Sequence, residues 1–234
     1  MTTPLDKILK NAESFDLICI TRRSWSSILS CQFQKMYIKY DDWAHVAIIL
    51  KNDILPNIEN KIYMLHASVS GGGIELCDFE KYIYLENSKI IRIGWCKLKN
   101  NPLHRNINDT DESYNKRIKI IKKKINNFYN YTINAKFNNF MIYLLLPSSF
   151  INIFHKKEKT DKEEKTDKEE KTDKEEKISI KKKYFCSNYI TTIYQLIDII
   201  DKDENPDTFF PGTLIKYNNK NGPIFNKPVL LNFI

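Results

Sequence analysis

The sequence is organised around one stretch, Tyr184-Phe185-Cys186-Ser187-Asn188-Tyr189-Ile190-Thr191. Apolar residues recur from it at helical spacing, and Cys186 stands four residues before the first of them: Ile190, Ile193, Ile197 and Ile200. The pattern predicts an amphipathic helix that carries Cys186 at its N-terminus on the buried face. The unpaired N–H groups and the positive dipole end of a helix N-terminus favour a thiolate, so we expect a lowered pKa for this thiol. A cysteine on an apolar helix face is also a common inert core residue, so its partners must decide the chemistry.

Two apolar runs earlier in the chain predict an antiparallel hairpin that carries two histidines. The runs are Trp43–Leu50 and Lys61–Ala67, with a polar loop between them. If their apolar ends are matched, His45 stands directly opposite His66 on the same face of the sheet. A slip of one residue would move one histidine to the other face, so the pairing depends on the register.

The remaining apolar patterns predict further strands and helices around this hairpin. Strands are expected over Phe15–Ile20 and Lys89–Trp95. Helical spacing predicts helices over Glu75–Glu86 and Tyr114–Phe128 and a helix that runs into a loop over Trp25–Tyr40. Pro4–Glu13 is expected to be a short helix or a lead-in to the first strand. The fold class is therefore α+β, with an antiparallel sheet packed against the cysteine helix.

Several segments are expected to carry no chemistry. The run Gly71–Gly73 lacks the Gly-Lys-Ser/Thr of a phosphate loop and predicts a tight connection between strands. The lysine-rich face of Tyr114–Phe128 is expected to face solvent, with membrane or acidic-partner binding as a weaker alternative. Residues 129–154 predict irregular structure with one or two short helices, and the tail after Asn205-Pro206-Asp207 should wrap back over the domain.

Composition limits the chain to one domain of residues 1–234, interrupted by a charged insertion at about residues 156–180. The insertion repeats Glu-Lys-Thr-Asp-Lys-Glu three times from Glu158 to Glu175, and such a tract cannot bury apolar surface. Its lysines and acidic residues nearly balance, so the net charge of +8 belongs to the rest of the chain. No compact basic cluster with interleaved aromatics is present, so we expect no nucleic-acid partner and keep nucleic-acid binding only as a minor alternative.

The cysteine pattern indicates a reducing compartment, and the distribution of apolar residues indicates a protein outside the membrane. The five cysteines form no Cys-x-x-Cys pair: Cys19, Cys31, Cys77, Cys96 and Cys186. The first thirty residues show no apolar signal region, and the longest apolar run, Phe140–Leu146, is too short to span a membrane. We therefore expect an intracellular, soluble protein without a transmembrane segment.

A thiol nucleophile needs a base within hydrogen-bond reach and commonly a third group that orients the base. Cys186, His45 and His66 are the residues that fit these roles. The same three side chains could instead ligate zinc, although they lack the short local spacing typical of structural sites. His104 lies in a polar stretch and is expected to be solvated.

Five short motifs, taken in order, resemble the circularly permuted papain-like hydrolases of the NlpC-type superfamily, the group that includes YiiX-like proteins and lecithin retinol acyltransferase-like enzymes. The motifs are Phe15-Asp16-Leu17-Ile18, Trp43-Ala44-His45-Val46-Ala47-Ile48, Leu65-His66-Ala67, Gly73-Ile74-Glu75-Leu76 and Tyr184-Phe185-Cys186-Ser187. The resemblance implies that Cys186 is the nucleophile, His45 its base and His66 the polar third member. YiiX-like proteins usually have Glu at the third position, whereas the acyltransferase-like relatives have His. Two further departures are Phe15, where the family commonly has Gly, and Asn188, where Glu often follows Cys-Ser.

The expected function is a thiol hydrolase or acyltransferase that cleaves an amide or ester bond through an acyl-cysteine intermediate. Peptide, peptidoglycan and lipid acyl groups all remain open as substrates, and no cofactor or metal is expected. The alternative is a catalytically inactive binding or scaffold module that retains the fold.

Overall fold

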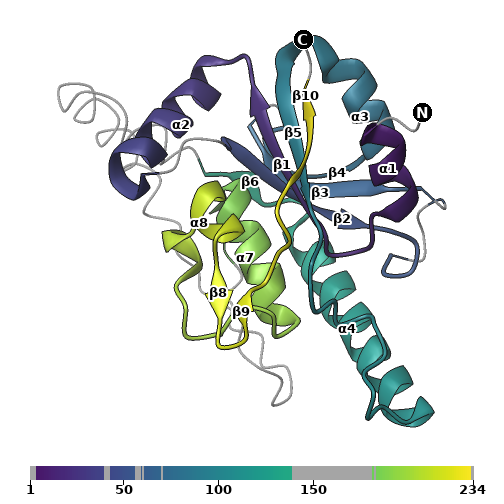
Figure 1. Cartoon of the computed structure of the whole chain (residues 1–234). Helices are drawn as coiled ribbons and strands as arrows, with labels where there is room; N and C mark the ends of the chain where they lie inside the picture. Colours follow the sequence, from purple (N-terminus) through teal and green to yellow (C-terminus); the bar gives the residue numbers. More distant parts are fainter. Residues whose placement is uncertain are drawn as a thin grey trace.

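The computed structural model describes residues 4–39, 43–55, 59, 61–69, 71–138, 181 and 183–232, and the repeated insertion lies outside them. The described residues form one large, mostly antiparallel sheet and six α-helices, so the α+β expectation is confirmed (Figure 1). The order of the strands across the sheet is β10-β5-β1-β2-β3-β4-β6-β7, and only β6 and β7 run parallel.

The strands that carry the sheet follow the apolar runs of the sequence. Their bounds are Leu17–Arg22 (β1), His45–Leu50 (β2), Tyr63–Ser68 (β3), Gly73–Asp78 (β4), Ile90–Cys96 (β5), Lys136–Phe137 (β6), Lys183–Tyr184 (β7) and Val229–Asn232 (β10). A small separate hairpin joins β8 (Asn218–Asn219) to β9 (Gly222–Pro223). The expected antiparallel pairing of β2 with β3 is confirmed, and β10 extends the sheet by pairing with β5, so the tail does return to the domain.

Alternating side chains along the central strands build two separate cores, one on each face of the sheet. On β2, Val46, Ile48 and Leu50 pack into the core that contains α7 (Cys186–Leu196), whereas Ala47 and Ile49 pack into the opposite core. That second core is covered by α1 (Pro4–Asn11) and α3 (Phe79–Glu86). Because both faces are covered, the strands read as nearly continuous apolar runs.

The cysteine helix α7 is buried on almost every side, more deeply than the amphipathic pattern predicts. The apolar stripe is buried as expected, but Ser187, Asn188 and Thr192 are buried as well. Their polar atoms have partners: the Ser187 hydroxyl donates to the Phe209 carbonyl, and the Thr192 hydroxyl donates 2.8 Å to the Asn188 carbonyl. These hydrogen bonds offset most of the cost of burying the polar groups, whereas the hydroxyl oxygen of Thr191, also buried in α7, has no hydrogen-bond partner among the described residues.

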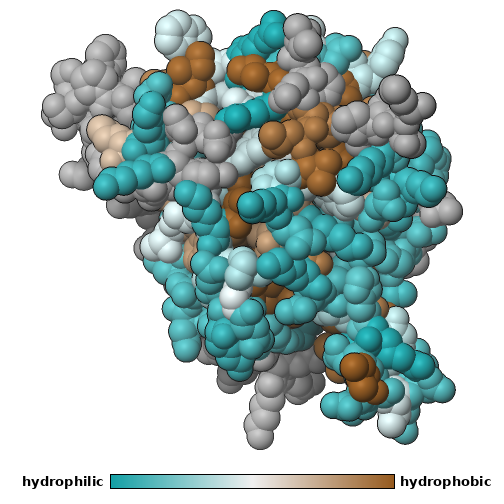
Figure 2. All heavy atoms as spheres, in the orientation of Figure 1, coloured by the Kyte–Doolittle hydropathy of each residue, from teal (hydrophilic) through white to brown (hydrophobic). Residues whose placement is uncertain are grey.

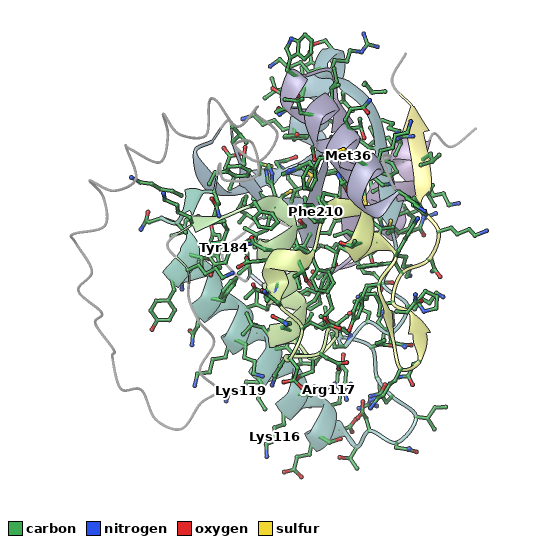
Figure 3. All side chains as sticks on the ribbon, turned by 90° about the vertical axis from the view of Figure 1, so that its left-hand side faces the viewer. Met36, Lys116, Arg117, Lys119, Tyr184 and Phe210 are labelled. Atoms are coloured by element: carbon green, nitrogen blue, oxygen red, sulfur yellow. The ribbon has the colours of Figure 1, made fainter. Side chains whose placement is uncertain are left out.

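Helix α4 (Asp111–Thr132) confirms the predicted basic helix and extends it at both ends. Ile121, Ile125 and Phe128 are buried, while Lys116 and Lys119 lie exposed on the outer surface of its first half (Figure 3). In Figure 2 hydrophilic side chains cover most of the surface below the level of α8 (Pro211–Ile215), where Figure 1 shows α4 and the hairpin of β8 and β9. The charged face of α4 is thus a solvated one.

The prediction of a helix was wrong for the first four residues of the segment 75–86. Residues 75–86 were expected to be a single helix, but Glu75–Asp78 complete strand β4, and α3 begins only at Phe79. Strand β4 pairs along its whole length with β3, and the Asp78 side chain then accepts a hydrogen bond from the Lys81 N–H to cap α3. The glycine run is indeed a connection between strands, from β3 to β4.

Candidate active site

His45 and His66 are brought together, but not by the predicted register. Strands β2 and β3 pair Ile48 with Leu65 and Leu50 with Tyr63, which is two residues away from the expected alignment. His66 is therefore a diagonal neighbour of His45 instead of its direct partner. A shift of two residues keeps both side chains on one face, and His45 Nε2 lies 2.8 Å from His66 Nδ1.

Glu75, Cys77 and Tyr82 contact the far side of the His66 imidazole. Its Nε2 lies 3.6 Å from Glu75 Oε2 and 3.7 Å from Cys77 Sγ, both on β4, and the Tyr82 ring packs edge-on against the imidazole. Glu75 is the direct cross-strand partner of His66. The sequence around Glu75 does not mark it as a neighbour of His66, because a helix predicted over residues 75–86 hides the cross-strand pair.

Burial is the main cause of the low basicity of both imidazoles. It lowers the pKa of His66 to about 4 and holds the pKa of His45 well below 6.5. The positive charges of the neighbours, His66 and Arg22 for His45 and Arg22 for His66, push both pKa values in the same direction. Both side chains are consequently neutral at pH 7, and a neutral imidazole can accept a proton.

Cys186 occupies the first turn of α7, as predicted, and its side chain is only 7% exposed. Backbone N–H groups of Val46, Ser187 and Cys186 itself, together with the Ser187 side chain, favour its thiolate. Burial nevertheless outweighs them and raises the thiol pKa to about 11. The expected lowering of the pKa was therefore wrong, because a helix terminus cannot offset the loss of water around a buried sulfur.

Two hydrogen bonds hold the N-terminus of α7, one within the helix's first turn and one to a residue 19 positions further along the chain. The Phe185 N–H donates 2.9 Å to Asn188 Oδ1, which caps the helix, and the Asn188 amide donates 2.8 Å to Asp207 Oδ1. Asp207 lies in the short 3-10 helix η3 (Pro206–Thr208). Asn188, a departure from the resembled family, thus holds the turn that carries Cys186.

The thiol and the imidazoles approach one cavity from opposite sides of the sheet. Alternation places His45 and His66 on the face of Ile49 and Met64, whereas α7 packs on the other face. They meet where β1 ends, β2 begins and β3 ends, and all three line one cavity of about 150 Å³. Among the hydrogen bonds of the described residues, none joins Cys186 Sγ to either imidazole.

Arg22 is a cavity residue that sequence reasoning missed. It ends β1, forms an ion pair with Glu86 and lies with its guanidinium over the Tyr82 ring, 5.9 Å from the centroid. The sequence placed it in a polar turn, and only the pairing of β1 with β2 brings it beside the histidines.

Neither the surface histidine His104 nor the other cysteines contribute to this cavity. His104 is on the surface, with Nε2 2.7 Å from Glu13 Oε2. None of the five cysteines, all within the described residues, forms a disulfide, although the sulfur atoms of Cys19 and Cys96 lie 3.8 Å apart. Within the described ranges, no three His, Cys, Asp or Glu residues are arranged to hold a metal ion, and no helix has the length and apolar character needed to cross a membrane.

Comparison with known proteins adds no relative. No protein-family model, no curated protein and no solved structure matches this chain.

Proposed function

We propose that this protein is a circularly permuted papain-like enzyme that transfers an acyl group through Cys186, with His45 as base and His66 as the residue that orients His45. The observation that carries the proposal is the convergence of a helix-head thiol and a hydrogen-bonded pair of neutral histidines on one cavity. In such a pair His45 Nε2–H donates to His66 Nδ1, which leaves His45 Nδ1 as the free base.

The reaction begins from a thiol and a neutral imidazole. As the sulfur attacks the carbonyl carbon of an ester or amide, His45 takes the thiol proton and the carbonyl electron pair moves to oxygen. We assign the backbone N–H of Cys186 as a donor to that oxyanion. The bond to the leaving alcohol or amine then breaks, the leaving group takes the proton from His45, and a thioester remains on Cys186. Water or another nucleophile attacks the thioester and releases the acyl group.

The missing hydrogen bond between thiol and imidazole is compatible with this mechanism. Catalytic hydrogen bonds are often long in structures without substrate and tighten when substrate binds. The Val46 N–H, which favours the Cys186 thiolate, belongs to the residue that directly follows His45, so the sulfur lies next to the start of β2.

A second observation favours the permuted papain-like family. Phe15, where that family commonly has Gly, has a backbone φ of 76°, in the left-handed region that glycine adopts most readily. The backbone therefore has the conformation that the family residue suits, although the side chain differs.

The rival function is an inactive module that retains the fold. Two features favour it: the thiol pKa of about 11, and the fact that no hydrogen bond of the described residues joins Cys186 Sγ to His45 or His66. Labelling separates the two functions. We expect a thiol-directed acylating probe to label Cys186 in the wild type, and C186A to lose the label. Cys31→Ala, which removes another cysteine that forms no disulfide, is the matched control and should keep the label. Unchanged labelling of the C186A variant at another cysteine would refute the assignment of the nucleophile, and loss of labelling in H45A but not in Glu80→Gln would favour an enzyme over a scaffold.

A further inference from the structure

We infer that the cavity beside Cys186 selects an uncharged, compact acyl group of about six carbon atoms, either a short chain or a single ring. This inference rests on the proposed function and adds the substrate class to it.

The volume of the cavity sets the size of the acyl group. It measures about 150 Å³, and an apolar cavity of roughly that volume in a protein core accommodates one benzene ring. A chain of about six carbons has a similar bulk, whereas a long fatty acyl chain would have to leave the cavity.

Aromatic side chains bound this space. Phe33 of α2 (Trp25–Ile38) and Phe210, at the start of α8, line it and contact each other, with ring centroids 5.3 Å apart. Figure 3 shows Phe210 beside α2, the helix that also carries Met36. Phe137 and Phe185 also line the cavity. Because Phe33 and Phe210 contact each other, an acyl chain longer than the space beside them has to displace these rings or extend past them toward solvent.

The charges around the cavity exclude a charged acyl group. Among the described residues that line it, none is Asp, Glu or Lys, and the single cation, Arg22, is already paired with Glu86. The two histidines are neutral because burial lowers their pKa values. An ammonium or carboxylate on the acyl chain would therefore enter a mostly apolar space whose described lining offers no unpaired opposite charge, which is costly.

Hydroxyl groups supply the polar side of the cavity. Ser24, Ser26, Ser27 and Ser30 line it from the start of α2. Hydroxyl groups of this kind can form hydrogen bonds with the polar ester or amide group of a substrate.

The test is acylation of the full-length protein by p-nitrophenyl esters, with the burst of p-nitrophenolate measured against the C186A variant. We expect the rate constant per ester concentration to rise about fourfold per methylene, as burial of each CH₂ predicts, from acetyl to hexanoyl, with no further gain at decanoyl. Phenylacetyl should react about as well as hexanoyl. The 6-aminohexanoyl and adipoyl monoesters should react at least about tenfold more slowly than hexanoyl, because their charge has no partner in the cavity.

Wall variants make the test specific to this cavity. Phe33→Leu and Phe33→Ala should move the optimum to octanoyl or longer, because each removes part of the aromatic wall. Trp25→Ala is the matched control on the same helix: its side chain is 80% exposed, and the profile should not move. Circular dichroism and thermal unfolding show whether the variants are folded, and Phe33→Leu is the conservative one if Phe33→Ala is not.

The outcomes separate this inference from the proposed function. Acylation that depends on Cys186 but is equally fast for all chain lengths, is fastest for acetyl, or keeps rising to decanoyl would overturn the inference and leave the nucleophile in place. A profile that Phe33→Leu leaves unchanged would overturn it as well. If no ester acylates Cys186, the proposed function itself fails, and the substrate class fails with it.

Discussion

His45 and His66 are joined by a hydrogen bond of 2.8 Å between Nε2 and Nδ1, although they are diagonal neighbours on strands β2 and β3. One nitrogen must donate and the other accept, so the two tautomers are fixed together. If His45 is the base, His66 carries its own proton on Nε2, the atom that faces Glu75. The protonation state of the pair then controls the proposed chemistry.

The first prediction concerns the pH dependence of acylation. Burial lowers the His45 pKa well below 6.5, so the imidazole stays unprotonated, and able to act as a base, until the pH falls well below that value. We expect the acylation rate of Cys186 to stay constant from about pH 9 down past 6.5 and to fall only at more acid pH. Stopped-flow measurement of p-nitrophenolate release across this range checks it. A rate that rises tenfold per pH unit toward the thiol pKa of about 11 would instead mean that free thiolate reacts without a base.

The second prediction concerns Glu75, which we expect to act as a positioning residue through His66. Its Oε2 lies 3.6 Å from His66 Nε2, so its negative charge stabilises a proton on the histidine pair without a short hydrogen bond. Glu75→Gln should lower the acylation rate about threefold to tenfold and move its acid limb to lower pH. Glu80→Gln, exposed on α3, is the control. A drop in rate with an unmoved acid limb would indicate only a structural role.

The sequence predicts the positions of most strands in the sheet, but it does not predict how the strands are aligned with one another. Continuous apolar runs identified β1, β2, β3 and β5, because a strand covered on both faces has no polar alternation. Strand β4 was missed because Leu76, Phe79 and Ile83 also fit helical spacing. The β2–β3 register was two residues off because the geometry of a long loop, which sets it, is not readable from composition.

The sequence predicts which residues form the candidate site better than it predicts their burial and pKa values. The helix-head position of Cys186 and the shared face of His45 and His66 follow from local periodicity. The thiol pKa does not, because it depends on burial by segments distant in sequence, such as the one that contains Phe209. Arg22 and Glu75 reach the histidines only through strand pairing, so no local pattern could reveal them.

The third prediction concerns Asp16, part of a motif that the resemblance singled out and that the structure makes a structural anchor. Its buried carboxylate accepts hydrogen bonds from the Trp95 indole at 2.8 Å, from the Leu98 N–H at 2.9 Å and from the Glu13 N–H at 3.0 Å. Asp16→Ala leaves these donors unsatisfied and should lower the free energy of unfolding by about 3 kcal/mol. Urea denaturation measures this, with exposed Asp203→Ala as the control. A loss as small as that of the control would mean that water replaces the carboxylate.

The last prediction concerns Phe15, which combines a fully buried side chain with a left-handed backbone. The ring contributes apolar burial, and the backbone conformation costs about 1 kcal/mol for any residue with a Cβ atom. Phe15 also accepts a 2.9 Å hydrogen bond from the Tyr194 hydroxyl at its carbonyl and donates 2.8 Å from its N–H to the Ile49 carbonyl, so its backbone is held in place.

At this position we therefore expect glycine to give a more stable protein than alanine, the reverse of the usual order in a strand. Both substitutions delete the ring and should destabilise the protein by a few kcal/mol, but only alanine keeps the strained Cβ. We expect Phe15→Gly to be more stable than Phe15→Ala by about 1 kcal/mol in urea denaturation. At Ile48, buried in a regular strand, the order should be reversed, because glycine there loses more backbone entropy than alanine. The same order at both positions would show that the φ of Phe15 carries no strain and would remove the backbone argument for a glycine-type position.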